Sequence, residues 1–439
     1  MSQSALIFCH SITPRLQYVI DFLSQYYEIL FRPTSDEEKY LKAQHACKIN
    51  YSYHRLSPGE IFIHAHVLLT ESYVRPVKVE CFDNNGYPAF FKTEGEPGFD
   101  LFAAIFFLLT RYEEYLPHKK DKFGRFSHRE SVAFKNDFLH LPLINIWLEH
   151  FRDLMKARNA DCAATKKAFS FTPTYDIDMA WSFRNKGFKR NAGALSLLFV
   201  QGKFRKLVQR IRVLQGRLPD PFDAYEWMDD LHRLYNSAPL YFILMARERS
   251  RLDKNIDVTS APFQLLVRDL SSKYEIGIHP SWASGDLPSL LTTEKSLLEA
   301  ITGKKVNCSR QHFIRFDLPQ SYHRLLALDI HHDYSMGYGS INGFRASVTT
   351  PFLWYDLKHE ETSKLLLHPF CFMDANAYYE QKLSAQKAFD ELMEFYRVIK
   401  SVNGKMVTIW HNSFLGTDKA FAGWRDMYAE FVATTSANS

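Results

Sequence analysis

One apolar run of this chain ends in two aspartates: Phe169-Ser170-Phe171-Thr172-Pro173-Thr174-Tyr175-Asp176-Ile177-Asp178. The run from Phe169 to Tyr175 predicts a β-strand, and alternate residues of an extended chain point to the same side. Asp176 and Asp178 can therefore share one site. Two close carboxylates repel each other unless a cation or a proton relieves the charge, and a divalent metal bound by one leaves the other free as a base. The alternative is a strand end that carries two acids for solubility or loop capping.

Two further apolar runs end in histidine. Glu275-Ile276-Gly277-Ile278 leads to His279, after which Pro280 interrupts regular structure, and Met406-Val407-Thr408-Ile409-Trp410 leads to His411. Active groups gather at the C-terminal ends of strands in parallel barrels, and imidazole is a good zinc ligand. His279 is therefore a candidate metal ligand, with a structural hydrogen-bonding role as the alternative.

The remaining pattern is one of strand-like runs separated by segments of helical length. This alternation predicts an α/β fold with mainly parallel strands. The runs are Leu240–Met245, Tyr274–His279, His312–Phe316 and Met406–Trp410.

The first 160 residues contain no catalytic constellation. They combine strand-like runs such as 61–67 with an apolar helix candidate at 100–115, for which Asp100 is a plausible N-cap. We expect that helix to lie buried between a small sheet and the neighbouring domain. Small and polar residues at 157–167 predict a linker, so we expect an N-terminal α+β domain at 1–165 and a second domain at 166–439.

The totals restrict the class of protein. A chain of 439 residues with 46% hydrophobic and 15% aromatic residues suits two domains, and a net charge of +5 does not favour nucleic acid as a partner. The six cysteines form no C-x-x-C pair, as expected of free thiols in a reducing compartment. The first 31 residues lack the pattern of a signal peptide, and no apolar stretch has the roughly 20 residues needed to span a bilayer. The expected location is the cytoplasm.

The segment 184–217 carries the strongest local charge signal, with ten basic residues and no acidic one. Apolar residues recur at helical spacing between Val200 and Leu214, which predicts a basic amphipathic helix. Such a helix can lie on an anionic membrane, here the inner membrane surface. The other interpretation is a solvated helix packed on its domain.

Thr174-Tyr175-Asp176-Ile177-Asp178 resembles the first motif of the NodB-type polysaccharide deacetylases (carbohydrate esterase family 4), in a bacterial variant with an added N-terminal domain. The resemblance covers about Phe169 to Gly416. It implies a distorted (β/α) barrel in which Asp176 is the catalytic base and Asp178 a metal ligand. Ile409-Trp410-His411 resembles the last motif of the family, which implies that His411 is the general acid.

The metal motif departs from the family pattern. His279 resembles the first histidine of the family's H-x-x-x-H motif, but Ala283 stands at the second position. Arg310 stands where the family has its arginine motif, which implies that it orients the base. His312, two residues on, is our replacement third ligand, and a strand starting just before 311–316 would put Arg310 and His312 on one face.

Other positions match stretches of the family outside the metal motif. Asp374 is near the fourth motif, where an acid supports the catalytic machinery, although a capping role is an equal alternative. The spare histidines, ranked below His312, are His331, His332 and His368. The residues assigned to substrate positioning are Asp333, Arg345, Asp374 and Trp282.

These expectations combine into a reaction. The resemblance implies hydrolysis of an N-acetyl group on a sugar or glycan precursor, with a divalent metal, zinc being the expected ion. The insertion at 184–217 suggests a lipid-linked or nucleotide-linked sugar. The alternative, motivated by Ala283, is a non-catalytic barrel that binds a glycan or a protein partner.

Overall fold

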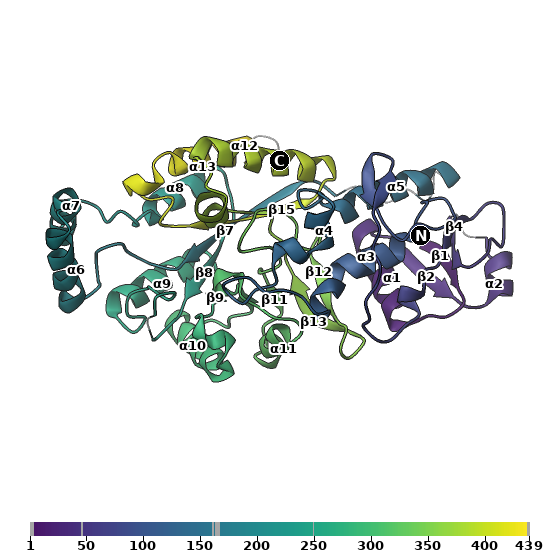
Figure 1. Ribbon diagram of the computed structural model, residues 1–439, viewed down its shortest axis with the longest axis horizontal. Helices are drawn as coiled ribbons and strands as arrows, with labels where there is room; N and C mark the ends of the chain where they lie inside the picture. The colour runs from purple at the N-terminus through teal and green to yellow at the C-terminus, as the bar shows by residue number, and fades with distance from the viewer. Residues whose placement is uncertain (1–3, 45–46, 160–161, 163–166, 249, 437–439) are drawn as a thin grey trace.

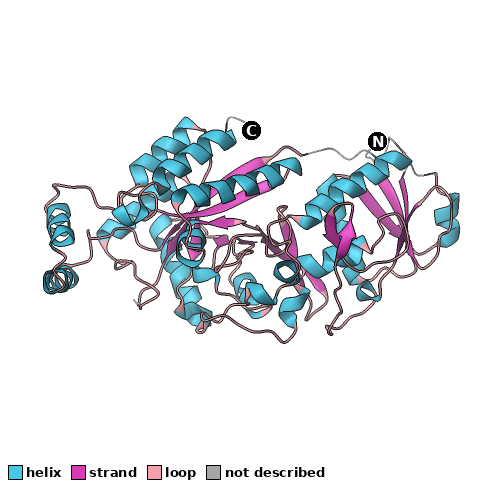
Figure 2. Cartoon of the chain, turned by 45° about the horizontal axis from the view of Figure 1, so that its top comes forward, coloured by secondary structure: helices cyan, strands magenta, loops and turns pink. Residues whose placement is uncertain are grey.

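The computed structural model describes residues 4–44, 47–159, 162, 167–248 and 250–436. Two sheets of mainly parallel strands organise these residues (Figure 1), one of four strands and one of nine. Figure 2 shows helices on the outside of both sheets. The predicted α/β class with parallel strands is confirmed.

The N-terminal sheet has the order β2-β1-β3-β4, and all its neighbouring strands are parallel. This differs from the expected α+β arrangement, because α1 crosses over between β1 and β2 and so lets them run in the same direction. The elements of this part are β1 (Ser4–Cys9), α1 (Pro14–Tyr27), β2 (Leu30–Thr34), α2 (Glu37–Lys42), β3 (Cys47–Ser52), β4 (Ile61–His64), β5 (Phe82–Asn84), β6 (Tyr87–Ala89), α3 (Leu101–Leu109), α4 (Val132–Lys135) and α5 (Leu143–Arg158).

Helix α3 starts where the sequence predicted and ends earlier. Asp100 is the N-cap, since its side chain accepts a hydrogen bond of 2.9 Å from the Ala103 amide, and every residue of the helix is buried. The helix stops at Leu109 because Arg111 adopts a left-handed backbone with φ 54°. The buried Arg111 guanidinium lies 2.8 Å from the carboxylate of Glu114, so this turn retains an internal ion pair.

The larger sheet has the order β12-β13-β11-β10-β9-β8-β7-β15-β14, and only β12 runs antiparallel to its neighbour. Among the described residues, the edge strands β12 and β14 do not pair with each other, so closure of the sheet into a barrel stays a prediction. The elements are β7 (Ser170–Ile177), α6 (Phe188–Val200), α7 (Phe204–Leu214), α8 (Tyr225–Leu234), β8 (Leu240–Leu244), α9 (Ala261–Lys273), β9 (Glu275–His279), α10 (Pro288–Thr302), β10 (Cys308–Ser309), α11 (Gln320–Ala327), β11 (His332–Asp333), β12 (Phe352–Asp356), β13 (Glu361–Leu367), β14 (Phe372–Met373), α12 (Ala385–Ser401), β15 (Lys405–His411) and α13 (Trp424–Ser436).

Three of the four predicted strands in this part are present as β8, β9 and β15, within one residue at either end. The strand predicted at His312–Phe316 is wrong. Residues His312–Ile314 form a tight 3-10 turn, in which Phe313 and Ile314 have φ values of 58° and 55°. Left-handed backbone cannot continue a strand, so the short strand β10 ends at Ser309.

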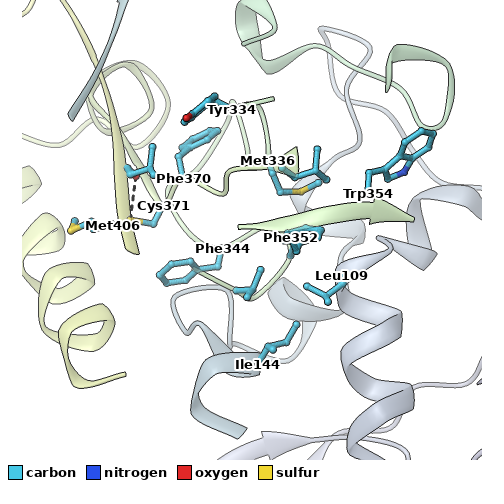
Figure 3. Close-up of a cluster of buried hydrophobic side chains, with 14 of the residues drawn as sticks. Leu109, Ile144, Tyr334, Met336, Phe344, Phe352, Trp354, Phe370, Cys371 and Met406 are labelled. Carbon is cyan, nitrogen blue, oxygen red and sulfur yellow. Dashed lines mark hydrogen bonds between the residues drawn. The ribbon is translucent and has the colours of Figure 1, made fainter. Parts of the chain in front are cut away.

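The two sheets are joined by a shared core. Figure 3 shows Leu109 of α3 and Ile144 of α5 in one buried hydrophobic cluster with Phe352 of β12. Buried charges cross the same boundary, where Arg345 bonds through Nε to a Glu114 oxygen at 2.8 Å. The N-terminal part is therefore packed firmly against the larger sheet.

The linker and the basic segment lie on either side of β7. Helix α5 runs to Arg158, and the predicted linker at 157–167 falls largely on residues 160–161 and 163–166, which lie outside the described residues. The basic segment forms two helices: α7 confirms the helix expected between Val200 and Leu214, and α6 precedes it, with the chain turning at Gly202, where φ is 65°. In the described ranges, none of the helices has the length and apolar character that a bilayer crossing requires.

Candidate metal centre

The predicted strand ends meet in one cleft. His411 of β15 is in register with Asp176 of β7, and His279 ends β9 two strands away from β7. All three line a cavity of about 420 Å³ together with Asp178 and His312. Parallel strands that end at the same edge of the sheet explain why residues so distant in sequence converge here.

Asp178, His279 and His312 form a group whose oxygen and nitrogen atoms lie within 4.8 Å of one another. The Nε2 atom of His279 lies 3.3 Å from Asp178 Oδ1, and Nε2 of His312 lies 3.5 Å from Asp178 Oδ2. One carboxylate and two imidazoles make up a set of protein ligands found in catalytic zinc sites, which leave a coordination position open.

Each histidine of this group is oriented through its other ring nitrogen. Nδ1 of His279 lies 2.7 Å from the carbonyl oxygen of Arg310, and Nδ1 of His312 lies 3.0 Å from a carboxylate oxygen of Asp253. Both acceptors require a proton on Nδ1, so Nε2 of each ring is the nitrogen that points towards Asp178 and is available to a metal. Histidines that bind metals are typically held in this way.

One carboxylate oxygen of Asp178 is free to bind a cation. Its Oδ1 atom is buried and has no hydrogen-bond partner among the described residues. Burial acts to raise the pKa of Asp178, but His312 and His279 outweigh it and hold that pKa well below its usual range. The carboxylate is therefore charged at neutral pH, and the three side chains fit a divalent metal.

Asp176 lies beside this group with a different partner. Arg310 donates through Nη1 to Asp176 Oδ1 at 2.8 Å, while Asp176 Oδ2 is 3.8 Å from His279 Nε2. Arg310 is fully buried, with Nε bonded to the Tyr334 carbonyl and the guanidinium 4.2 Å from the Phe242 ring centre. The arginine therefore fixes one oxygen of Asp176 and leaves the other facing the group.

His411 also lies beside Asp178, with Nε2 3.6 Å from Asp178 Oδ2. Its Nδ1 bonds to Asp374 Oδ1 at 2.6 Å, and its backbone amide donates to Asp374 Oδ2 at 2.7 Å. Burial acts to lower the pKa of His411, but the Asp374 carboxylate outweighs it and the pKa rises to about 10. His411 therefore carries a proton at neutral pH.

None of the four residues assigned to substrate positioning is among the residues that line the cavity. Asp374 instead bonds to His411. Asp333 is buried in strand β11, where it accepts a hydrogen bond of 2.7 Å from Ser309 Oγ of the neighbouring strand β10. Arg345 is held in the ion pair with Glu114. Trp282 packs against Phe313, a residue that lines the cavity, with the two ring centres 5.5 Å apart.

The cavity has contributions that sequence reasoning missed. Phe123 and Arg125 come from the N-terminal part, and Arg125 Nη1 donates to the strained Phe313 carbonyl at 2.7 Å and to Gly339 at 2.9 Å. Asp253, the partner of His312, lies in a loop without a motif. A histidine that binds a metal through one ring nitrogen usually donates a hydrogen bond from the other. That requirement is the signal that could have prompted a search for an acidic partner of His312.

The three spare histidine candidates, His331, His332 and His368, are not among the residues that line the cavity. His332 and His368 bond to each other at 3.0 Å, and His331 lies 3.4 Å from the exposed Asp329. A second group of metal-binding types consists of His323, Asp356 and His359. Both imidazoles of that group already bond to the same Asp356 oxygen at 2.6 Å.

Comparisons with known proteins give a family match for the N-terminal part only. Residues 5–160, less than half of the chain, match DUF7033, a family of unknown function. No curated protein matches the sequence.

Three solved structures are similar to 62% of this chain at low identity. A protein of Mycobacterium smegmatis assigned as a polysaccharide deacetylase is 14% identical, with a TM-score of 0.40 and 85% of that chain covered. The PuuE allantoinase is 10% identical, with a TM-score of 0.38 and 84% covered. The polysaccharide deacetylase Bc1974 of Bacillus cereus is 8% identical, with a TM-score of 0.31 and 89% covered. At such values the chemistry has to be argued from the chain's own side chains.

Proposed function

We propose that this protein is a metal-dependent amidohydrolase that removes N-acetyl groups from a sugar or a glycan precursor. The observation that carries the proposal is the arrangement of Asp178, His279 and His312 around one point, with a second carboxylate, Asp176, held beside it by Arg310. A divalent metal bound by the three ligands, zinc by our expectation, would polarise the amide carbonyl and make a nearby water acidic.

The chain's own groups divide the proton transfers between them. Asp176 accepts the proton of the attacking water, since Arg310 occupies only one of its oxygens. His411 is charged at neutral pH and gives its proton to the departing amine, and Asp374 keeps its Nδ1 engaged so that Nε2 faces the reacting group. A base and an acid that both lie beside the ligand group suit hydrolysis of an amide.

The cavity walls support a sugar as the substrate. Phe123, Phe313 and Phe414 line it, and aromatic rings offer flat apolar surfaces to the faces of a sugar ring. Arg251 and Lys254 also line it, and their positive charge suits a phosphate such as that of a nucleotide-linked or lipid-linked sugar. A volume of about 420 Å³ lies in the range of small-molecule sites.

The experiment is an assay of acetate release. The purified protein would be incubated with N-acetylglucosamine oligomers and with a UDP-linked N-acetyl sugar, before chelation, after chelation and after zinc is restored. The proposal predicts release that chelation abolishes and zinc restores. Release that survives complete chelation would contradict the role of the metal.

A non-catalytic glycan-binding protein is the second candidate, and Ala283 at the position of the family's second histidine favours it. That candidate predicts saturable binding of the same sugars without acetate release.

We also propose a division into domains at 1–165 and 166–439 and a location in a reducing compartment. The two sheets fall on either side of that boundary, and all six cysteines are free thiols.

A further inference from the structure

The segment 184–217, here called the helical arm, stands apart from the rest of the molecule. Figures 1 and 2 show α6 and α7 at one end, away from both sheets. The arm has ten lysines and arginines and no acidic residue. A hollow at its base is lined by Arg184 and Arg217 beside Leu218. The arm is thus a positive projection of the protein.

The arm is also the most apolar part of the exposed surface. Seven of the nineteen large hydrophobic side chains that the described chain exposes lie in the arm, including Phe188 at 88% and Val200 at 81% exposure. Around the turn between the helices, Phe199 and Phe204 meet edge to face at 5.8 Å, and both are more than half exposed. Water surrounds this apolar cluster unless a partner covers it.

We propose that the helical arm docks the protein on an anionic lipid bilayer, with the turn between α6 and α7 entering the headgroup region. Lysines and arginines bordering exposed Phe, Leu and Val side chains satisfy both requirements of such a surface, attraction to acidic headgroups and burial of apolar area. A second copy of the chain is a poor occupant, because two arms would bring twenty positive charges together without a negative one. Nucleic acid would satisfy the charges and leave the apolar turn in water.

The base of the arm is tied to the wall of the candidate metal centre. Arg190 donates to the carbonyl oxygens of Lys254 at 2.9 Å and Asn255 at 3.2 Å. Lys254 lines the cavity together with Arg251 and Leu252. If the proposed function holds, on which this step rests, an arm docked on a bilayer brings the cavity close to sugars carried by lipids.

The test is sedimentation with vesicles. Wild-type protein should co-sediment with vesicles of phosphatidylcholine containing 30% phosphatidylglycerol at low salt, and remain in the supernatant with pure phosphatidylcholine or at high salt. Each basic side chain near such a surface contributes about 1 kcal/mol, or about fivefold in partitioning. The double variant Arg205→Glu/Lys206→Glu should therefore bind at least about 25-fold more weakly, and Phe199→Ser/Phe204→Ser should also lose binding.

The matched control is Lys39→Glu/Lys42→Glu in α2, at the opposite end of the molecule in Figure 1. It changes the net charge equally and should bind like the wild type. The proposal would be overturned if the control variant lost vesicle binding equally, or if the wild-type protein did not bind anionic vesicles. So would a stable dimer that Phe199→Ser/Phe204→Ser dissociates in sedimentation velocity, since a second copy would then cover the turn. Vesicle binding needs neither metal nor substrate, so its failure is distinct from a failure to release acetate.

Discussion

Asp253 contacts His312, the proposed third metal ligand, and replacing Asp253 gives the sharpest test of the proposed ligand set. Asp253→Asn preserves the size of the side chain but removes the negative charge that His312 Nδ1 contacts at 3.0 Å. The aspartate also accepts a 2.9 Å hydrogen bond from the Trp282 amide. Both contacts go to the same Asp253 oxygen, so asparagine can keep them through its carbonyl oxygen; the loop should persist and only the negative charge is lost.

The magnitude follows from this single contact. Loss of a partner that orients a ligating histidine typically costs about 10- to 100-fold in metal affinity, which corresponds to about 1.4–2.8 kcal/mol. We expect a loss in this range for Asp253→Asn, and a larger one for His312→Ala because a ligand itself disappears. Asp286→Asn is the control, since Asp286 is 63% exposed and pairs only with Arg315 among the described residues.

The assay is a competition titration of zinc between the protein and a chromophoric chelator, with far-UV circular dichroism to check folding. If Asp253→Asn and His312→Ala both bind zinc within twofold of the wild type, His312 is not a ligand and the proposed ligand set is wrong.

Three other predictions concern the proton donor, the buried ion pair and acid stability. His411→Ala should lower turnover by about 10²- to 10⁴-fold with unchanged metal content. Asp374→Asn should lower turnover less, because the imidazole of His411 remains. Measurements of kcat and metal content on the same samples check both. Arg345→Met should lower the free energy of unfolding in urea by about 3–5 kcal/mol, because Arg111 alone is then left to compensate the buried carboxylates of Glu113 and Glu114. Arg233→Met, in an exposed pair, should change it by less than about 1 kcal/mol. Burial acts to raise the pKa of Glu114, but Arg345 and Arg111 together outweigh it and the pKa falls from 4.5 to about 2. This group's stabilisation is therefore complete above pH 4.5 and is lost as the pH falls towards 2, and Glu114→Gln should flatten the dependence of stability on pH in that window.

The sequence predicted the strand ends because their pattern is local. An apolar run followed directly by an acid or a histidine marks where a buried strand reaches solvent, and β7, β9 and β15 end at or next to Asp176, His279 and His411. The N-cap of α3 at Asp100 was predictable for the same reason, since capping depends on a few adjacent residues.

What the sequence did not predict depends on contacts between distant segments. The partner of Arg345 is 231 residues away, so a basic residue expected to position substrate instead closes an ion pair between the two sheets. The left-handed backbone at Phe313 is stabilised from outside by Arg125, and the local apolar pattern there resembled a strand. Asp253 lies in a loop whose composition carries no sign of its contact with His312.

Asp176→Asn tests the central claim most directly, with metal content and acetate release measured on the same sample. The claim assigns Asp176 to proton transfer and Asp178, His279 and His312 to the metal. It predicts close to one divalent ion per chain in both the wild type and the variant purified without chelator, and acetate release that falls by about 10²- to 10⁴-fold in the variant. Undiminished acetate release from Asp176→Asn, or a catalytically active wild type without stoichiometric metal, would contradict the claim.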